Sequence, residues 1–298
     1  MTIGTGRGWE AVGTYRALCG ERVFTVDAPS VGPERHEPLL VLHGFPTSSF
    51  DYAAVLDGLR AGRRVLLFDM VGYGLSSKPD RAYRMALQAD VATAFVRELG
   101  LERLALLTHD VGDTVGGELL ARRAEGTWPV EVTRRVLTNG SIYIAQAHLS
   151  DGQLLLLGLP DEVLAPGIPI DAASIARSLR ETFSPHTPTV PAGWPEDPVP
   201  AAAAQVVHDD GHLLLPRLIR YVEERRADER RFTGAIETDP SPLTVVWGLD
   251  DPIAVASMVD TLVAARPDTT VTRLEGVGHY PMVEAPQRFL DAVLPGLA

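Results

Sequence analysis

The chain has 298 residues, enough for one large α/β domain with an insertion or for two ordinary domains. Its 39 acidic and 27 basic residues give a net charge of -12, the wrong sign for binding nucleic acid or an anionic membrane. A lone cysteine, Cys19, cannot form an internal disulfide. We find neither a signal-peptide pattern nor an apolar run of the roughly 20 residues that cross a bilayer. We therefore expect a reduced, cytoplasmic protein.

Short apolar runs recur along the chain, and each of them ends in a turn. Nearly continuous apolarity predicts strands buried on both faces, as in a parallel sheet. Between several runs, apolar residues spaced three and four apart predict helices, for example over 85–99 and 115–124. This alternation predicts an α/β fold with a mostly parallel central sheet flanked by helices. The predicted strands are 38–44, 63–70, 104–110, 134–140, 243–248 and 269–276.

The alternation stops between residues 144 and 235, where helical segments flank a proline-rich loop. We interpret 144–235 as a helical cap inserted into a core domain made of 1–143 and 236–298. The proline-rich loop has two open interpretations, a disordered linker or a packed segment. Trp194 lies within it and argues for some packing.

The segment LALLTHDVGDTVGGELL predicts a strand, a sharp turn at Asp110 and a helix that begins at once. In such a nucleophile elbow the residues two before and two after the tip must be small. Gly112 meets this requirement fully and Thr108 approximately. The alternative is that Asp110 only caps the helix, because aspartate is a favoured N-cap residue.

A carboxylate at the tip changes the chemistry of the elbow. It is ionised at neutral pH and needs no base to activate it. Attack on an ester carbonyl would give a mixed anhydride, whereas attack on a saturated carbon displaces a leaving group and gives an alkyl ester. Epoxides and alkyl halides are therefore the natural targets, and the chain contains no G-x-S-x-G motif for a serine mechanism.

Backbone amides for an oxyanion hole are predicted at two places. The sequence His43-Gly44-Phe45-Pro46 follows an apolar strand, and the amides of Phe45 and Val111 could stabilise charge on a tetrahedral intermediate. An ordinary Gly-Pro turn is the alternative interpretation of this motif.

Two further motifs supply an acid and a histidine. Asp250 and Asp251 come directly after one predicted strand, and His279 comes directly after the next. The order of nucleophile, acid and histidine is that of the α/β-hydrolase triad. We favour Asp251 as the acid because it lies directly before Pro252, whereas Asp250 could cap the turn.

Together, HGFP, HDVG, WGLDDP and GHYP resemble the α/β-hydrolases that include epoxide hydrolases and haloalkane dehalogenases. The runs HDVGDTVGGELLARR, VLTNGSIY and DDGHLLLPRLIRYVEERR are similar to the subgroup that includes the mesoderm-specific transcript protein. The resemblance implies an α/β-hydrolase fold and an Asp-His-Asp triad. The tryptophan halide clamp usual in dehalogenases is missing, because Val111 follows the elbow residue and Phe45 stands in HGFP.

The resemblance also implies a proton donor in the cap. Tyr221 matches a cap tyrosine with which epoxide hydrolases protonate the opening oxygen, although it could instead be a packing residue beside Leu218 and Val222. We further assign His43, Tyr143 and Trp194 to substrate binding. No second cap tyrosine is evident, because the first half of the cap has none after Tyr143.

These assignments predict a two-step hydrolase. Asp110 forms an ester with the substrate while Tyr221 assists the leaving oxygen, and His279, oriented by Asp251, then activates water to cleave the ester. The expected partners are a small apolar substrate with an electrophilic carbon and water, with no cofactor and no metal. A dehalogenase with the same triad and a non-catalytic ligand-binding or scaffold protein are the alternatives.

Overall fold

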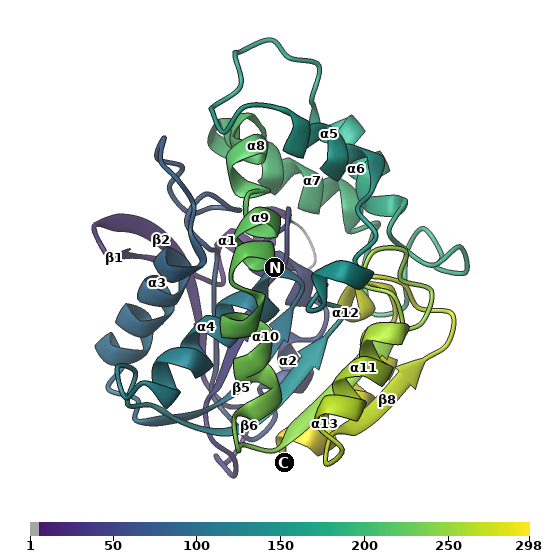
Figure 1. Ribbon diagram of the computed structural model, residues 1–298. Coiled ribbons are helices and arrows are strands. Elements are labelled where there is room, and N and C mark those ends of the chain that lie inside the picture. The colour runs from purple at the N-terminus through teal and green to yellow at the C-terminus, as the bar shows by residue number, and fades with distance from the viewer. Residues whose placement is uncertain (1–5) are drawn as a thin grey trace.

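The computed structural model describes residues 6–298 and contains an eight-stranded sheet with helices on both faces (Figure 1). The strand order is β1-β2-β4-β3-β5-β6-β7-β8. From β4 to β8 all neighbours are parallel, while β1 pairs with β2 and β2 with β4 in antiparallel register. The strands are β1 Thr14–Leu18, β2 Glu21–Ala28, β3 Leu39–Leu42, β4 Val65–Phe68, β5 Arg103–His109, β6 Glu131–Thr138, β7 Leu243–Gly248 and β8 Thr270–Leu274.

The six predicted strands are present as β3 to β8. Every residue of β3, β4 and β7 is buried, as their continuous apolarity predicts. The hairpin of β1 and β2 was not predicted, because β1 is partly exposed and mixes polar with apolar residues. Its two-residue turn places Cys19 and Gly20 at positive φ, which is the turn geometry that the twist of a hairpin favours.

Two groups of helices enclose the sheet. Helices α3, α4 and α10 lie side by side, with α4 against β3 and β5, while α13 packs on β6, β7 and β8 and contacts α2 (Figure 1). The bounds in this part of the chain are α1 Gly6–Glu10, η1 Ser49–Tyr52, α2 Leu56–Leu59, α3 Met85–Glu98, α4 Val111–Ala124, α10 Glu229–Thr238, α11 Ser257–Ala265, α12 Pro281–Glu284 and α13 Pro286–Leu297.

Short helices between β6 and β7 form a layer above the carboxyl ends of the strands (Figure 1). They are η2 Ile144–Gln146, α5 Asp151–Gly158, α6 Ala172–Arg180, α7 Val199–Val207, η3 His208–Leu214, α8 Leu215–Leu218 and α9 Tyr221–Ala227. Capping boxes begin two of these helices, at Ser150 for α5 and at Asp171 for α6. Helix α10, which includes the last residues of the predicted cap, packs along α4 beside the sheet. The division into core and cap remains our proposal.

The proline-rich segment is packed around its tryptophan. Trp194 is 6% exposed, its ring centroid lies 5.4 Å from that of Phe50, and its Nε1 donates to the carbonyl of Val283 at 3.0 Å. These contacts bind the segment to the core and rule out a disordered linker at this point.

The turn between β5 and α4 is a sharp elbow. Asp110 has φ 51° and ψ -115°, a region that non-glycine residues rarely adopt, and α4 begins at the next residue. A Cβ at Gly112 would lie 2.4 Å from the carbonyl oxygen of Leu42. Thr108, two residues before the tip, is accommodated because Gly116 faces its methyl group. The small residues of the motif are therefore required by the close approach of α4 to the sheet.

We predict that Gly112→Ala destabilises the protein by about 1–3 kcal/mol, because the added methyl group would meet backbone rather than a movable side chain. Gly234→Ala in α10 is the matched control. Nothing lies within 4 Å of a Cβ at Gly234, so this change should stabilise the helix by about 0.5–1 kcal/mol. Urea unfolding of both variants measures the difference, and equal stabilities would contradict the proposed close approach.

Candidate active site

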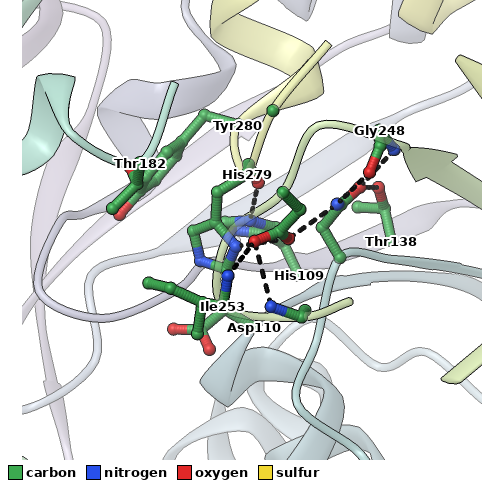
Figure 2. A network of polar contacts seen from close by, with 12 residues as sticks. His109, Asp110, Thr138, Thr182, Gly248, Ile253, His279 and Tyr280 are labelled. Carbon is green, nitrogen blue, oxygen red and sulfur yellow. Dashed lines mark hydrogen bonds and ion pairs between the residues drawn. The ribbon is translucent and has the colours of Figure 1, made fainter. Parts of the chain in front are cut away.

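Asp110, Asp251 and His279 meet at the carboxyl edge of the sheet. They follow β5, β7 and β8, and the carboxyl ends of parallel strands lie at one edge. The Nδ1 atom of His279 lies 2.7 Å from Oδ2 of Asp251, and both side chains are buried. Asp110 and His279 lie together in the polar network of Figure 2. The three predicted triad residues are thus brought together, and the contact between His279 and Asp251 is the one expected of a base and its orienting acid.

Asp251 is held by hydrogen bonds on both of its oxygens. Oδ1 accepts from the amides of Ile253 at 2.8 Å and Ala254 at 2.9 Å, while Oδ2 accepts from Asn139 Nδ2 at 2.8 Å as well as contacting His279. Asn139 follows β6 with a positive φ of 43°, and its Oδ1 accepts from the amide of Gly248 at the end of β7. The sequence reasoning overlooked Asn139, although its place directly after a strand, before Gly140, was a usable signal.

Asp250 points to a different partner. Its Oδ2 accepts a hydrogen bond from Ser184 Oγ at 2.6 Å, in the segment that follows α6. The same segment holds the histidine loop, because the amide of His279 donates to the carbonyl of Thr182 at 3.0 Å. The two adjacent acids therefore have different partners: Asp251 contacts His279, and Asp250 contacts the segment that follows α6.

The carboxylate of Asp110 already contacts one predicted oxyanion-hole donor. Its Oδ2 accepts from the amide of Phe45 at 2.8 Å. Val111 is the first residue of α4, so its amide belongs to the positive end of that helix. Gly44 permits this approach, because a Cβ there would lie 2.9 Å from that of Asp110. The amide of Phe45 thus contacts the Asp110 side chain, while the part of the Val111 amide in an oxyanion hole stays a prediction.

His279 is surrounded by negative charge. Burial lowers its pKa, but the charge and hydrogen bond of Asp251 and the charge of Asp110 outweigh this and raise the pKa to about 9. The neighbouring His109 behaves in the opposite way, because burial and the charge of His279 lower its pKa to about 4. Protonated His279 is therefore the stable form while Asp110 carries its charge.

Tyr221, at the start of α9, reaches the same site from above. Its ring is 2% exposed, and its centroid lies 5.6 Å from that of Phe45. Burial and the charge of Asp110 raise its pKa, whereas Arg225 and a hydrogen bond with Gln153 act in the opposite direction. Its neighbours Leu218 and Val222 are also buried. Tyr221 is therefore both packed among apolar side chains and near enough to Asp110 for the two groups to interact.

Three residues assigned to substrate binding have other partners. The Nε2 atom of His43 accepts from the amide of Met70 at 3.0 Å, and its Nδ1 lies 2.8 Å from the carbonyl oxygen of Gly44, so both ring nitrogens are engaged within the core. Tyr143 donates to Glu237 Oε1 at 2.7 Å. Trp194 lines only a small separate hollow beside Phe50. None of the three side chains lines the cavity that contains His279, and their part in substrate binding stays a prediction.

A cavity lined in part by His279 lies beneath the layer of short helices. It has a volume of about 230 Å³. Its lining is largely aliphatic, and His279 is the only ionisable group among the lining residues apart from the tyrosine next to it. Such a cavity favours an uncharged, mostly apolar molecule. The lining residues are Phe45, Pro46, Ser150, Gly152, Gln153, Leu155, Leu156, Pro169, Ile170, Ser174, Ile175, Ser178, Leu179, Thr182, Leu215, Ile253, His279 and Tyr280.

Two buried acids near the elbow were not singled out from the sequence. Burial and the charges of Asp69 and Asp110 raise the pKa of Asp51 to about 8, although its hydrogen bond from Thr47 acts against this. Asp113 accepts from Thr108, and burial raises its pKa well above the usual range. Asp51 is brought near Asp110 only by folding, whereas Asp113 lies three residues after Asp110 in the first turn of α4.

Neither a metal site nor a membrane span is found in the part of the chain that the structure describes. Within residues 6–298, no group of three or more His, Cys, Asp or Glu side chains is arranged to hold a metal ion. Over the same range, no helix combines the length and apolarity that a bilayer span requires.

The sequence from residue 37 to 286 matches the family model described as alpha/beta hydrolase fold. The chain belongs to the α/β-hydrolase fold family. This agrees with the parallel sheet, the elbow and the order of the three site residues. The α/β-hydrolase superfamily and the fold that the motifs predicted are thereby confirmed, while the branch with an aspartate nucleophile stays a prediction.

Two relatives and one solved structure illustrate what this α/β-hydrolase is similar to. It is 35% identical to the putative hydrolase LipZ of Mycobacterium tuberculosis, covering 99% of this chain and 98% of LipZ. It is 31% identical to the mesoderm-specific transcript homolog protein of Bos taurus, over 96% of this chain and 86% of that protein. The structure of the epoxide hydrolase CorEH matches with a TM-score of 0.70 at 18% identity, over 95% and 97% of the two chains. This last similarity shows the fold alone.

We predict that Asp110→Asn lowers the pKa of His279 from about 9 by about one unit or more, because the change removes one of the charges that raise it. Asp250→Asn is the matched control, since that side chain faces Ser184 instead. Titration of the His279 ring resonances by NMR gives both values. Equal pKa values in the Asp110→Asn variant and the unmodified hydrolase would contradict the electrostatic coupling.

Proposed function

We propose that this α/β-hydrolase opens an epoxide by attack of Asp110 and then hydrolyses the resulting alkyl-enzyme ester to release a diol. The observation that carries the proposal is a carboxylate on the tip of the elbow, with Oδ2 held 2.8 Å from the amide of Phe45. A carboxylate attacks saturated carbon to give an ester that water can cleave, and it needs no proton acceptor for this step.

In the first step an oxygen of Asp110 forms a bond to one epoxide carbon. The bond between that carbon and the epoxide oxygen breaks, and its electron pair goes to the oxygen. Tyr221 gives its proton to this oxygen and becomes a phenolate. The buried position of Tyr221 beside Phe45 supports this role.

In the second step His279 removes a proton from water, whose oxygen attacks the ester carbonyl of Asp110. Loss of the Asp110 charge on esterification lowers the pKa of His279, so His279 releases its proton to solvent and the neutral ring can act as the base; it takes up a proton from solvent again once Asp110 regains its charge. The amides of Phe45 and Val111 stabilise the tetrahedral intermediate. When the intermediate collapses, the alkoxide leaves and takes a proton from His279 to give the alcohol. The proton on the carboxylic acid of Asp110 then passes to the phenolate of Tyr221.

The substrate class follows from the cavity. Its lining includes aliphatic residues of α5 and α6, such as Leu156, Ile175 and Leu179, together with His279. We therefore propose an uncharged apolar epoxide. Dehalogenation is the alternative reaction, which release of chloride or bromide from alkyl halides would reveal, and a protein that only binds such ligands would show neither product.

We predict that His279→Gln forms the alkyl-enzyme ester but hydrolyses it very slowly, because the histidine acts only in the second step. Intact-protein mass spectrometry after incubation with styrene oxide should show accumulation of one added epoxide mass. Asp110→Ala is the control and should show none. A His279→Gln protein that binds the epoxide yet never gains mass would argue against the proposal.

A single turnover in heavy-oxygen water, with enzyme in excess, locates the nucleophile directly. If Asp110 attacks carbon and water attacks the ester carbonyl, the product oxygen comes from Asp110 and the solvent oxygen stays on the enzyme. We expect unlabelled product and label in the peptide that contains Asp110. Label in the first product, with none in that peptide, would mean that water attacks the substrate and that Asp110 is not the nucleophile.

A further inference from the structure

Arg225 is a buried cation beside the elbow that the sequence reasoning did not single out. It lies on α9, one turn after Tyr221, and is 1% exposed. Its Nε donates to Thr114 Oγ1 at 2.8 Å and its Nη1 to the carbonyl of Ser141 at 2.7 Å. Its Nη2 lies 3.4 Å from the backbone carbonyl oxygen of Asp110. One guanidinium thus contacts the nucleophile, the first turn of α4 and the segment after β6.

All of these hydrogen-bond partners are neutral. Among residues 6–298 no carboxylate oxygen lies within 4.0 Å of the Arg225 guanidinium, although the positive charge of Arg225 acts at longer range on the buried carboxyl group of Asp113. Burial of a charge without a partner is costly, so such a residue calls for a compensating interaction. Two residues of the proposed site flank Arg225: its guanidinium carbon lies 5.2 Å from the centroid of the Tyr221 ring, and its Nη2 lies 3.4 Å from the backbone carbonyl oxygen of Asp110.

The proposed first step moves a negative charge across this region. The charge starts on the carboxylate of Asp110 and ends on the oxygen of Tyr221. We infer that Arg225 is a positioning residue whose fixed positive charge, next to the Tyr221 ring, stabilises the negative charge that develops on the Tyr221 oxygen and so accelerates formation of the ester. This inference rests on the proposed function. Preorganised charge of this kind stabilises a transition state because it needs no rearrangement during the reaction.

The same geometry distinguishes the two steps. In the second step the negative charge develops at the ester carbonyl, where the amides of Phe45 and Val111 and the protonated His279 stabilise it. Loss of the Arg225 charge should therefore slow ester formation more than ester hydrolysis. A purely structural role in holding α9 would affect both steps or neither.

The decisive comparison is Arg225→Gln with Arg225→Lys. Glutamine keeps hydrogen-bond donors but removes the charge, whereas lysine keeps the charge but loses the planar fork. Arg226→Gln is the matched control, because Arg226 is the next residue on α9 and is exposed. Thermal unfolding identifies the folded variants. Single-turnover mass spectrometry with styrene oxide then gives the rates of ester formation and hydrolysis separately.

We expect Arg225→Gln to slow ester formation about a hundredfold, the effect of losing one preorganised electrostatic group, and hydrolysis by much less. Arg225→Lys should retain more of the rate than Arg225→Gln, and Arg226→Gln should match the unmodified hydrolase. Equal losses in the lysine and glutamine variants, or equal slowing of both steps, would overturn the inference. If the unmodified protein forms no ester at all, the proposed function itself fails.

Discussion

The strained backbone at Asp110 is the constraint on which the site depends. A non-glycine residue at φ 51° and ψ -115° costs about 1–3 kcal/mol and persists only where its surroundings fix it. Here α4 begins at the next residue, and Gly112 lets that helix approach the carbonyl of Leu42. The strain lifts one carboxylate clear of the strand and brings it to the amide of Phe45.

Burial turns this small group of charges into a coupled system. The pKa of His279 depends on the charges of Asp251 and Asp110 together, whereas His109, 5.0 Å away between ring centroids, is kept neutral by burial and by the charge of His279. A change of charge on Asp110 therefore changes the pKa of His279 without any movement of the backbone. In water the same charges would be screened, so burial strengthens the interaction between these side chains.

The layer of short helices completes the site as well as covering it. The amide of Ser184 donates to Glu284 at 2.8 Å, and Glu284 in turn accepts from the amides of Gly278 and Tyr280 on either side of His279. Arg225 makes a similar connection between α9 and the elbow. Because both connections join segments far apart in the sequence, the position of the histidine loop and the shape of the substrate cavity are set together.

The sequence by itself determined the parallel sheet, the elbow and the pairing of an acid and a histidine with it, because these depend on local patterns: continuous apolar strands, a small residue at Gly112 and polar residues directly after strands. It could not place side chains that act through distant partners. His43, Tyr143 and Trp194 proved to be engaged with Met70, Glu237 and Val283, each of which is brought near only by folding. Asn139 and Arg225 were overlooked for the same physical reason, since a hydrogen bond between residues about a hundred positions apart leaves no periodic trace in the chain.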